Sequence, residues 1–321
     1  MLRQLGRWNS AGCSSYQSLT QEPYAMQASL LTNLLLPLAL GIIMLGLGLG
    51  LTTEDFRRVA RYPKAVLAGL SLQTLVLPWV AFALALGFGL PPELAVGLML
   101  LAASPGGATA NIYSHLARGD VALNITLTAI NSLLCLLTLP LILNLSLEYF
   151  LGAGQYVPPP TKKVIEVAVI IVLPVALGML IRAKAAAFAA RAEKPLRLLS
   201  VMVLVLLIVA AVRQEWSTLT RYFAVVGLAC LSFNLISMAT GYAAPRALKL
   251  PKRQAIAIAM EIGIHNGTLA IFIALNVLQN PTVSVPAAVY SLLMFFTAAL
   301  FAFWSARRTE PRPAITPSQG Q

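Results

Sequence analysis

The apolar residues of this chain come in runs of about 20 residues, and this length constrains the fold more than any other feature. A helix needs about 20 residues to cross the hydrocarbon core of a bilayer, because it rises about 1.5 Å per residue. Short polar connections separate the runs, and only 11% of the 321 residues are charged while 58% are hydrophobic. The sequence therefore predicts an all-α polytopic membrane protein with about nine transmembrane helices. The runs cover residues 29–51, 64–88, 92–115, 121–146, 164–182, 197–212, 221–243, 254–277 and 285–305.

The basic residues indicate how such a chain is oriented. The net charge of +12 could suggest a nucleic-acid partner, but the Lys and Arg residues lie in the short connections and not along one polar face. Most of the 23 Lys and Arg residues fall on one side of the predicted membrane. The positive-inside rule then places the C-terminus in the cytoplasm and the N-terminus outside, in a multi-pass protein of the cell inner (plasma) membrane.

The two ends and the cysteines say less about function. Residues 1–25 contain no apolar h-region and are predicted to be a disordered N-terminal segment, not a signal peptide. Residues 26–308 form the predicted transmembrane domain, and residues 309–321 are predicted to be a disordered tail. The three cysteines have no metal-site spacing, and Cys135 and Cys230 lie inside apolar runs as expected of core residues.

Two of the runs are interrupted by residues that helices tolerate poorly. The third contains SPGGATANIYSHLARGD (104–120), in which the proline removes a helix donor and two glycines add backbone freedom. The eighth contains MEIGIHNGTLA (260–270), with two glycines four residues apart. We predict a break in each helix, although a healed proline kink and a small-residue packing face are simpler interpretations of the same residues.

The second interruption also holds an acid, an imidazole and an amide. An ionised carboxylate at bilayer depth costs several kcal/mol unless it is paired, protonated or next to water, so Glu261 indicates an ion or substrate path. His265 lies four residues further on, and two hydrogen bonds could equally satisfy it as a neutral core residue. Asn266 is expected to bind freed backbone groups or a ligand.

A polar stripe crosses the fourth run. Asn124, Thr128 and Asn131 recur with the spacing of one helix face, and Gln73 is a lone amide in the second run. Interhelical hydrogen bonding, worth about 0.6 kcal/mol per bond in membranes, would by itself account for all four side chains.

The two interruptions fall at corresponding places if the chain is divided after the fourth run, because each lies in the penultimate run of its half. With five runs in the second half, the two interrupted runs cross the membrane in opposite directions. Such broken helices in inverted halves are typical of secondary transporters, where the half-helix ends and unwound carbonyls bind an anion and a hard cation at the midplane.

These segments resemble the bile acid:sodium symporter family. The resemblance is carried by GLGLTTEDFRRV (47–59), SPGGATANIYSHLARGDVALN (104–124) and EIGIHNGTLA (261–270), and it extends over about residues 29–308. It implies ten spans in two inverted five-helix repeats, divided into a panel and a core domain, with two discontinuous helices crossing in front of two sodium ions. This chain matches members that lack the first span.

The resemblance also implies the site residues. The first sodium ion would be bound by Asn111, Asn124, Thr128 and Glu261, while Ala110 stands where the family often has a serine ligand. The second would be bound by Gln73, Glu261 and the carbonyls of Ile262 and Ile264, with His265 in place of a glutamine. Because an imidazole nitrogen is a poor ligand for a hard cation, one or two coupled sodium ions are expected. Substrate would lie near Ala108, Thr109, Asn266 and Gly267.

The resulting expectation is a sodium-coupled symporter of an organic anion that works by alternating access. The family carries bile acids, sulfated steroids and small acids, and its breadth favours a small monocarboxylate. One alternative is a proton-coupled carrier that uses Glu261 and His265, since an ordinary imidazole titrates near pH 6.5. A membrane-embedded enzyme with these residues as acid and base is a second alternative, but the sequence has no HExxH motif or other catalytic set. A sensor or channel is a third.

Overall fold

The computed structural model describes residues 36–107, 109–152, 161–214 and 216–308, and these residues are almost entirely helical. No strand occurs within these ranges, where a single isolated β-bridge is found. The elements are α2 (Leu36–Gly50), α3 (Thr53–Arg61), α4 (Pro63–Ser71), the π-helical turn η2 (Leu72–Val76), α5 (Leu77–Gly87), α6 (Pro92–Ala103), α7 (Ala110–Leu116), α8 (Val121–Leu151), α9 (Thr161–Lys184), α10 (Ala186–Gln214), α11 (Trp216–Ala247), α12 (Lys252–Gly263), α13 (Gly267–Phe272), the π-helical turn η3 (Ile273–Val277), the 3₁₀ turn η4 (Pro281–Ser284) and α14 (Val285–Arg307).

The all-helical fold class predicted from the apolar runs is confirmed, and every predicted run contains at least one helix. Within the described residues, four helical segments are long and apolar enough to cross a membrane: Pro63–Gly87, Val121–Leu151, Thr220–Ala247 and Pro281–Arg307. Three shorter apolar helices accompany them, at Leu40–Gly50, Pro92–Ala103 and Gly267–Val277. A count of nine crossings therefore stays a prediction. The predicted disordered segments, 1–25 and 309–321, lie outside the described residues.

Both predicted helix breaks are present. The third run is divided into α6 and α7 by an extended segment that starts at Ser104, and the eighth is divided into α12 and α13 by Ile264, His265 and Asn266. Proline and glycine explain the first break, because the proline cannot donate the next helical hydrogen bond. In the second break Gly267 begins α13 immediately after the N-cap residue Asn266.

The two broken segments begin in the same way. Before each, the chain leaves the preceding helix through a left-handed residue, Gly89 with φ 60° and Lys249 with φ 61°. In each case the next amide bonds back five residues, from Leu90 N–H to the Ala85 carbonyl (3.0 Å) and from Leu250 N–H to the Pro245 carbonyl (2.9 Å). This is the hydrogen-bond pattern of a Schellman cap. The helices that follow, α6 and α12, are both 12 residues long.

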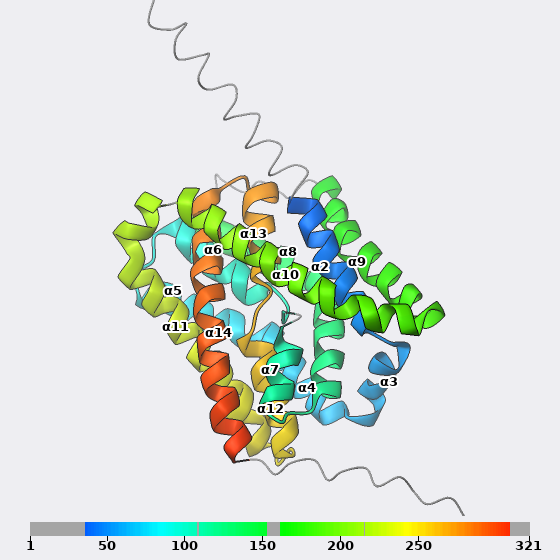
Figure 1. Cartoon of the computed structure of the whole chain (residues 1–321). Helices are drawn as coiled ribbons and strands as arrows, with labels where there is room; N and C mark the ends of the chain where they lie inside the picture. Colours follow the sequence, from blue (N-terminus) through cyan, green and yellow to red (C-terminus); the bar gives the residue numbers. More distant parts are fainter. Residues whose placement is uncertain (1–35, 108, 153–160, 215, 309–321) are drawn as a thin grey trace, which may run out of the picture.

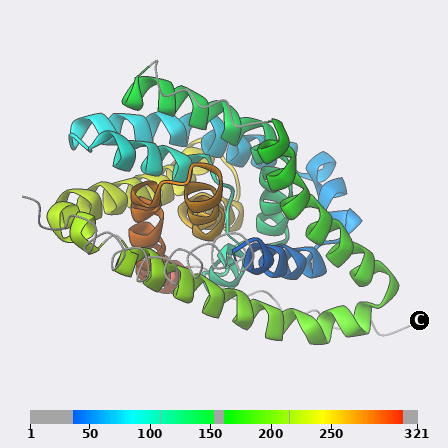
Figure 2. The same ribbon diagram turned by 90° about the horizontal axis from the view of Figure 1, so that it is seen from above.

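Three helices pack together on one side of the broken pair: α2, α9 and α10 (Figures 1 and 2). The contact between α2 and α9 is close enough to require glycine. A Cβ at Gly48 would lie 2.2 Å from the Val175 carbonyl oxygen, and one at Gly178 would lie 2.6 Å from that of Leu45. α12 is buried along nearly its whole length and packs against α4, α7, α8, α11 and α14. The broken helices therefore lie between a glycine-packed group of three helices and the rest of the bundle.

A glycine in α6 gives a test of this packing. A Cβ at Gly97 would lie 2.3 Å from the Val283 carbonyl oxygen and 2.9 Å from Cδ of Pro286, so α6 could not approach η4 and α14 as closely. We expect Gly97→Ala to lower the free energy of unfolding by about 1–3 kcal/mol, which is typical of an overpacked core. The thermal unfolding midpoint of the purified protein in detergent measures this change. The control is Gly87→Ala, since that position faces open space, and equal midpoints for the two variants would contradict the prediction.

Candidate functional site

The two helix breaks pair with each other through their backbones. Gly106 and His265 form an antiparallel β-bridge. The N–H of Gly107 donates to the Ile264 carbonyl at 2.7 Å, and the N–H of Asn266 donates to the Pro105 carbonyl at 2.8 Å. Each break thus supplies partners for polar groups that the other break frees, as irregular backbone at bilayer depth requires. The broken helices therefore cross at a defined point.

Two buried amide side chains bind the carbonyls at the ends of α6 and α12. Gln73, in the π-helical turn η2, donates from Nε2 to the carbonyls of Ala102 (3.1 Å) and Ser104 (2.9 Å). Asn234, in α11, donates from Nδ2 to the Gly263 carbonyl at 2.8 Å. The Gly263 carbonyl also accepts the Tyr290 hydroxyl at 2.9 Å. One amide thus steadies each of the two half-helices immediately before the crossing point.

Glu261, in the last turn of α12, is fully buried and surrounded by neutral donors from α8. Its Oε2 accepts the Thr128 hydroxyl at 2.6 Å, and its Oε1 accepts Asn131 Nδ2 at 3.2 Å. Asn124 Nδ2 lies 3.4 Å from Oε2 and 2.9 Å from the Ala257 carbonyl. The polar stripe of α8 is therefore directed at one carboxylate, as its helical spacing allows.

Gly106, in the first break, also lies against the Glu261 carboxylate. A Cβ at Gly106 would lie 2.3 Å from both Cδ and Oε1 of Glu261, so any larger residue would push the carboxylate away. The backbone of the first break therefore lies directly against the acid of the second. Because of this contact, the position of the Glu261 side chain depends on how the two broken helices cross.

Several buried oxygens near the crossing have no hydrogen-bond donor. They belong to the side chains of Gln73, Asn111, Asn124, Asn131 and Asn234, and in each case the amide oxygen is the unpaired atom. Buried oxygens without donors are costly unless they bind a cation or water. Neutral oxygens together with one carboxylate are the ligand type that a hard cation prefers.

His265 has partners that differ from those of Glu261. Its Nδ1 lies 3.2 Å from the Ser104 carbonyl, which Gln73 also contacts, and its ring stacks on Phe233 with a centroid distance of 5.4 Å. Tyr290 packs edge-on against the His265 ring at 5.4 Å and also contacts Phe233, with a centroid distance of 5.7 Å, so the three rings form one cluster. Glu261 and His265 lie four residues apart in sequence, but α12 ends between them at Gly263. Their side chains therefore lie in different surroundings.

The remaining predicted site residues are divided between the crossing and a cavity. Ile262 and Ile264 are fully buried at the end of α12, and the Ile264 carbonyl is bonded to Gly107. Asn111 is half-buried on α7 and lines the cavity, while its predicted partners Asn124 and Thr128 contact Glu261. Ala108 lies outside the described residues.

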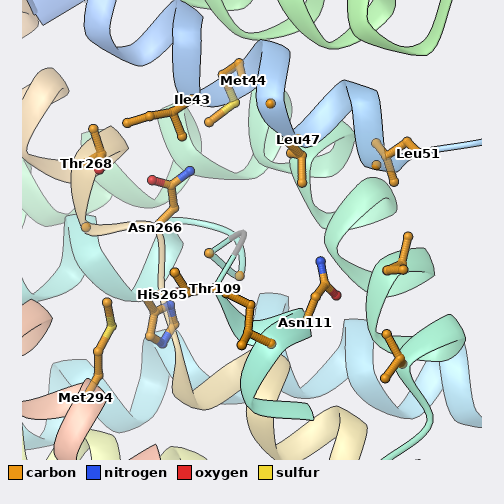
Figure 3. A pocket seen from close by; sticks show the side chains of 18 of the residues that line it. Ile43, Met44, Leu47, Leu51, Thr109, Asn111, His265, Asn266, Thr268 and Met294 are labelled. Carbon is orange, nitrogen blue, oxygen red and sulfur yellow. The ribbon is translucent and has the colours of Figure 1, made fainter. Parts of the chain in front are cut away.

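The cavity has a volume of about 300 Å³ and lies beside the crossing (Figure 3). Thr109, His265 and Asn266 lie on the crossing side, where Gly267 also lines the cavity. The opposite wall is formed by Ile43, Met44 and Leu47 of α2 and by Leu51, which follows the end of that helix. Asn266 caps α13, because its Oδ1 accepts the Leu269 N–H at 3.1 Å. Its Nδ2 is then the end of the amide that remains for other partners. A Cβ at Gly267 would lie 2.0 Å from Ser291 Oγ, so a larger residue would displace this hydroxyl of α14.

Four contributors were not predicted as site residues. Asn131 belongs to the polar stripe but was not assigned to an ion site, although its spacing from Asn124 and Thr128 could have indicated it. Asn234 is a lone amide in an apolar run, as Gln73 is, and this would have been the signal for it. Phe233 and Tyr290 look like ordinary core residues in the sequence, so nothing indicated their contact with His265.

The family model described as "Sodium Bile acid symporter family" matches residues 37–221. The "Uncharacterized sodium-dependent transporter YocS" of Bacillus subtilis (strain 168) is 31% identical over 270 residues, which cover 84% of this chain and 82% of the relative. The "Probable sodium/metabolite cotransporter BASS2, chloroplastic" of Oryza sativa subsp. japonica is 30% identical over 85% of this chain and 64% of its own length. The "Ileal sodium/bile acid cotransporter" of Oryctolagus cuniculus is 25% identical over 75% of this chain and 69% of its own length.

The adjacent glycines of the first break allow a test of the Glu261 environment. Gly106→Ala should displace the Glu261 carboxylate. In Gly107→Ala the added Cβ would lie 3.1 Å from its nearest neighbour, the His265 carbonyl oxygen, and would not touch Glu261. If Glu261 binds sodium as the sequence predicts, sodium should raise the unfolding temperature of the wild type and of Gly107→Ala. We expect the Gly106→Ala variant to lose this stabilisation. Thermal unfolding in detergent with sodium chloride, and with potassium chloride at equal ionic strength, measures it.

A sodium-induced shift in Gly106→Ala as large as that of the wild type would contradict this prediction. It would mean that the carboxylate keeps its ligands after the added methyl group, or that sodium binds elsewhere.

Proposed function

We propose that this chain, which belongs to the sodium bile acid symporter family, carries an organic anion into the cell together with sodium by alternating access. The family and its relatives identify the chain as an integral membrane, sodium-dependent transporter of the bile acid or metabolite type.

The observation that carries the proposal is the buried Glu261 carboxylate with its neutral oxygen-bearing neighbours. We assign the first sodium ion to Glu261, Thr128, Asn124 and Asn131, because the structure gathers these four side chains at one place. A sodium ion there would compensate the buried negative charge, and the amide oxygens of Asn124 and Asn131 are available to bind it. Asn111, whose amide oxygen is also unpaired, is a further ligand in this assignment.

The second sodium ion is assigned to the other side of the α12 end, with Gln73 and the carbonyls of Ile262 and Ile264. The unpaired Oε1 of Gln73 and the contact of its Nε2 with the Ser104 carbonyl support this assignment. His265 contacts the same carbonyl and offers nitrogen where a cation prefers oxygen. We therefore propose that the second ion is bound more weakly than the first.

The anion is assigned to the cavity, against Thr109, Asn266 and Gly267. The cap bond of Asn266 turns the donor end of its amide toward the space between the crossing and α2 (Figure 3). The amide group can therefore donate to a carboxylate without a change of side-chain orientation. Ala108, assigned to the same site by family resemblance, remains part of the proposal.

Coupling follows from the shared crossing point. Sodium ions on one side and the anion on the other contact the same backbone segments, which are held by the Gly106–His265 bridge. Ordering of this crossing by either ligand should tighten binding of the other, and thermodynamic linkage makes the effect reciprocal. Neutralisation of Glu261 by sodium also lowers the electrostatic cost of placing an anion nearby.

The proposed topology assigns the helices to two domains and the structure to one conformation of the transport cycle. We assign α2, α9 and α10 to a panel domain and the remaining helices to a core domain, arranged as inverted repeats of nine crossings with a cytoplasmic C-terminus. The matching starts of α6 and α12 and their antiparallel pairing support an inverted repeat. The cavity is lined by the second half of α2 and by α7, whose ends reach the positively charged side, so this conformation is assigned as inward-facing.

Proton coupling through Glu261 and His265 is the less favoured mechanism. The two side chains lie in separate surroundings, because Glu261 is bonded to α8 whereas His265 is packed among Phe233 and Tyr290. A shared proton or an acid and base pair, as an enzyme would also need, requires hydrogen-bond reach between the two groups or a bridging water.

The sodium assignment predicts the effect of two variants. Glu261→Gln should abolish sodium-driven uptake in proteoliposomes, because it removes the charge while keeping the shape. Thr128→Ala should raise the sodium concentration for half-maximal uptake by about tenfold, as expected for loss of a hydrogen bond to a charged group. Cys135→Ala, also buried on α8, is the control and should behave as the wild type does. Sodium-dependent uptake of normal rate by Glu261→Gln would overturn the assignment.

His265 tests the number of ions. Replacing it by glutamine restores an oxygen ligand, so His265→Gln should steepen the dependence of uptake on sodium and flatten any dependence on pH. The measurement is the initial uptake rate against sodium at several pH values for both proteins. Identical Hill slopes and pH profiles would show that His265 only packs against Phe233 and Tyr290.

A further inference from the structure

We infer that the end of α14, with the adjacent ends of α11 and α12, binds the headgroup of an anionic phospholipid. Arg307 and Arg308 bind the phosphate of this lipid, and its acyl chains lie along the exposed face of α14. The inference does not depend on the transported substrate or on the helix crossing. It follows from where α14 ends, from the position of its basic residues and from the helices that support them.

One face of α14 is apolar and exposed up to the end of the helix. The last of the four segments that are long and apolar enough to cross a membrane ends at Arg307. Large apolar side chains are exposed along it at helical spacing, at Leu292, Phe296, Leu300 and Phe303. Arg307 follows Phe303 by four residues and therefore continues the same face. The apolar face thus ends in a cation, as expected where a helix passes from hydrocarbon to lipid headgroups.

Aromatic rings hold both arginines at this end. The guanidinium carbon of Arg307 lies 3.9 Å from the ring centre of Phe303, and that of Arg308 lies 5.0 Å from the ring centre of Trp304. A guanidinium stacked on a ring uses its face and keeps its N–H edge for an acceptor, and a phosphate can accept two parallel hydrogen bonds from that edge. Within the described residues, neither guanidinium forms an ion pair with a carboxylate. Both cations are therefore placed for an anion that this part of the chain does not supply.

The neighbouring helices fix the position of this end. Tyr242 of α11 packs edge-on against Trp304, with a centroid distance of 5.7 Å, and against Phe301 at 5.8 Å. Lys252, the first residue of α12, donates from Nζ to the Arg308 carbonyl. The end of α14 and the start of α12 lie together at the lower end of the molecule in Figure 1. The ends of three helices therefore form one surface.

This surface is positively charged. The connections 117–120 and 246–253 meet beside the end of α14, because the Ser305 hydroxyl donates to the Ala117 carbonyl at 3.2 Å and the Asp120 N–H donates to the Arg253 carbonyl at 2.9 Å. Together with residues 303–308, these connections contain the basic residues Arg118, Arg246, Lys249, Lys252, Arg253, Arg307 and Arg308. Asp120 is the single acid in the three segments, and its carboxylate caps α8. Basic clusters of this kind at a membrane surface attract lipids of net negative charge.

A phospholipid matches this surface better than a soluble phosphate does. A free phosphate would use the two arginines but not the rings beside them, although Phe303 is 58% exposed and Trp304 is 38% exposed. A phospholipid uses both, since its phosphate reaches the guanidinium groups while its acyl chains cover the rings. A zwitterionic headgroup would bring its own cation close to the arginines, so a lipid of net negative charge is favoured.

Fluorescence quenching of Trp304 measures this binding. The purified protein is reconstituted in vesicles of phosphatidylcholine with increasing fractions of phosphatidylglycerol, and one lipid at a time carries bromine on its acyl chains, which quenches tryptophan on contact. The difference between the wild type and Trp304→Phe isolates the signal of this residue. We expect phosphatidylglycerol to bind beside Trp304 about 30-fold more tightly than phosphatidylcholine, the factor that two basic residues near a membrane surface contribute together. Equal affinity of the two lipids would overturn the inference.

Two double variants separate this site from a general attraction to a positively charged protein. Arg307→Gln combined with Arg308→Gln should abolish the preference for phosphatidylglycerol. The matched control is Arg182→Gln combined with Lys184→Gln, which removes the same charge from the last turn of α9 and should keep the preference. Equal losses in the two double variants would contradict a site at the end of α14.

A final comparison separates a lipid from a soluble phosphate. Sodium phosphate and sodium chloride are added to the vesicles at equal ionic strength, and both should weaken the preference for phosphatidylglycerol to the same extent by screening. Selective displacement by inorganic phosphate would assign the two arginines to a soluble anion and would overturn the lipid site.

Discussion

The backbone pairing of two helix breaks is the interaction on which the site depends. Helices interrupted inside a membrane leave carbonyl and N–H groups without partners, and here the Gly107 and Asn266 amides bond across to the opposite break. Gln73 and Asn234 bind the carbonyls that remain at the ends of α6 and α12. The breaks are therefore not loose segments, because each is held both by the other and by a buried amide.

The buried acid and the cavity lie on opposite sides of this pairing. Gly106 contacts the Glu261 carboxylate and also lines the cavity, so a single backbone segment separates the proposed cation from the proposed anion. Because only this segment lies between them, binding of one ligand can change the binding site of the other. Any change in how α7 meets α12 alters the surroundings of both, which is the behaviour that a coupled carrier requires.

Much of this arrangement could be predicted from local sequence. Pro105 with two glycines, and the glycines around His265, are local signals of a broken helix, and an acid in an apolar run is informative by itself. The orientation of the α8 stripe toward Glu261 could be proposed only through the family resemblance, because helical spacing shows a shared face but not what it faces. The contacts of His265 with Phe233 and Tyr290, and the apolar wall from α2, depend on tertiary packing between distant segments. No periodicity in those segments distinguishes a cavity wall from ordinary core.

The mutual pairing of the breaks also bears on how the protein is made. During synthesis the first broken helix enters the membrane long before the segment around His265 has left the ribosome. Until then the Pro105 carbonyl and the Gly107 N–H lack the partners that they have in the finished protein. The first half of the chain is therefore integrated in a provisional state, in which water, lipid headgroups or the insertion machinery must solvate the break. Final assembly is a late, long-range event that depends on the second half.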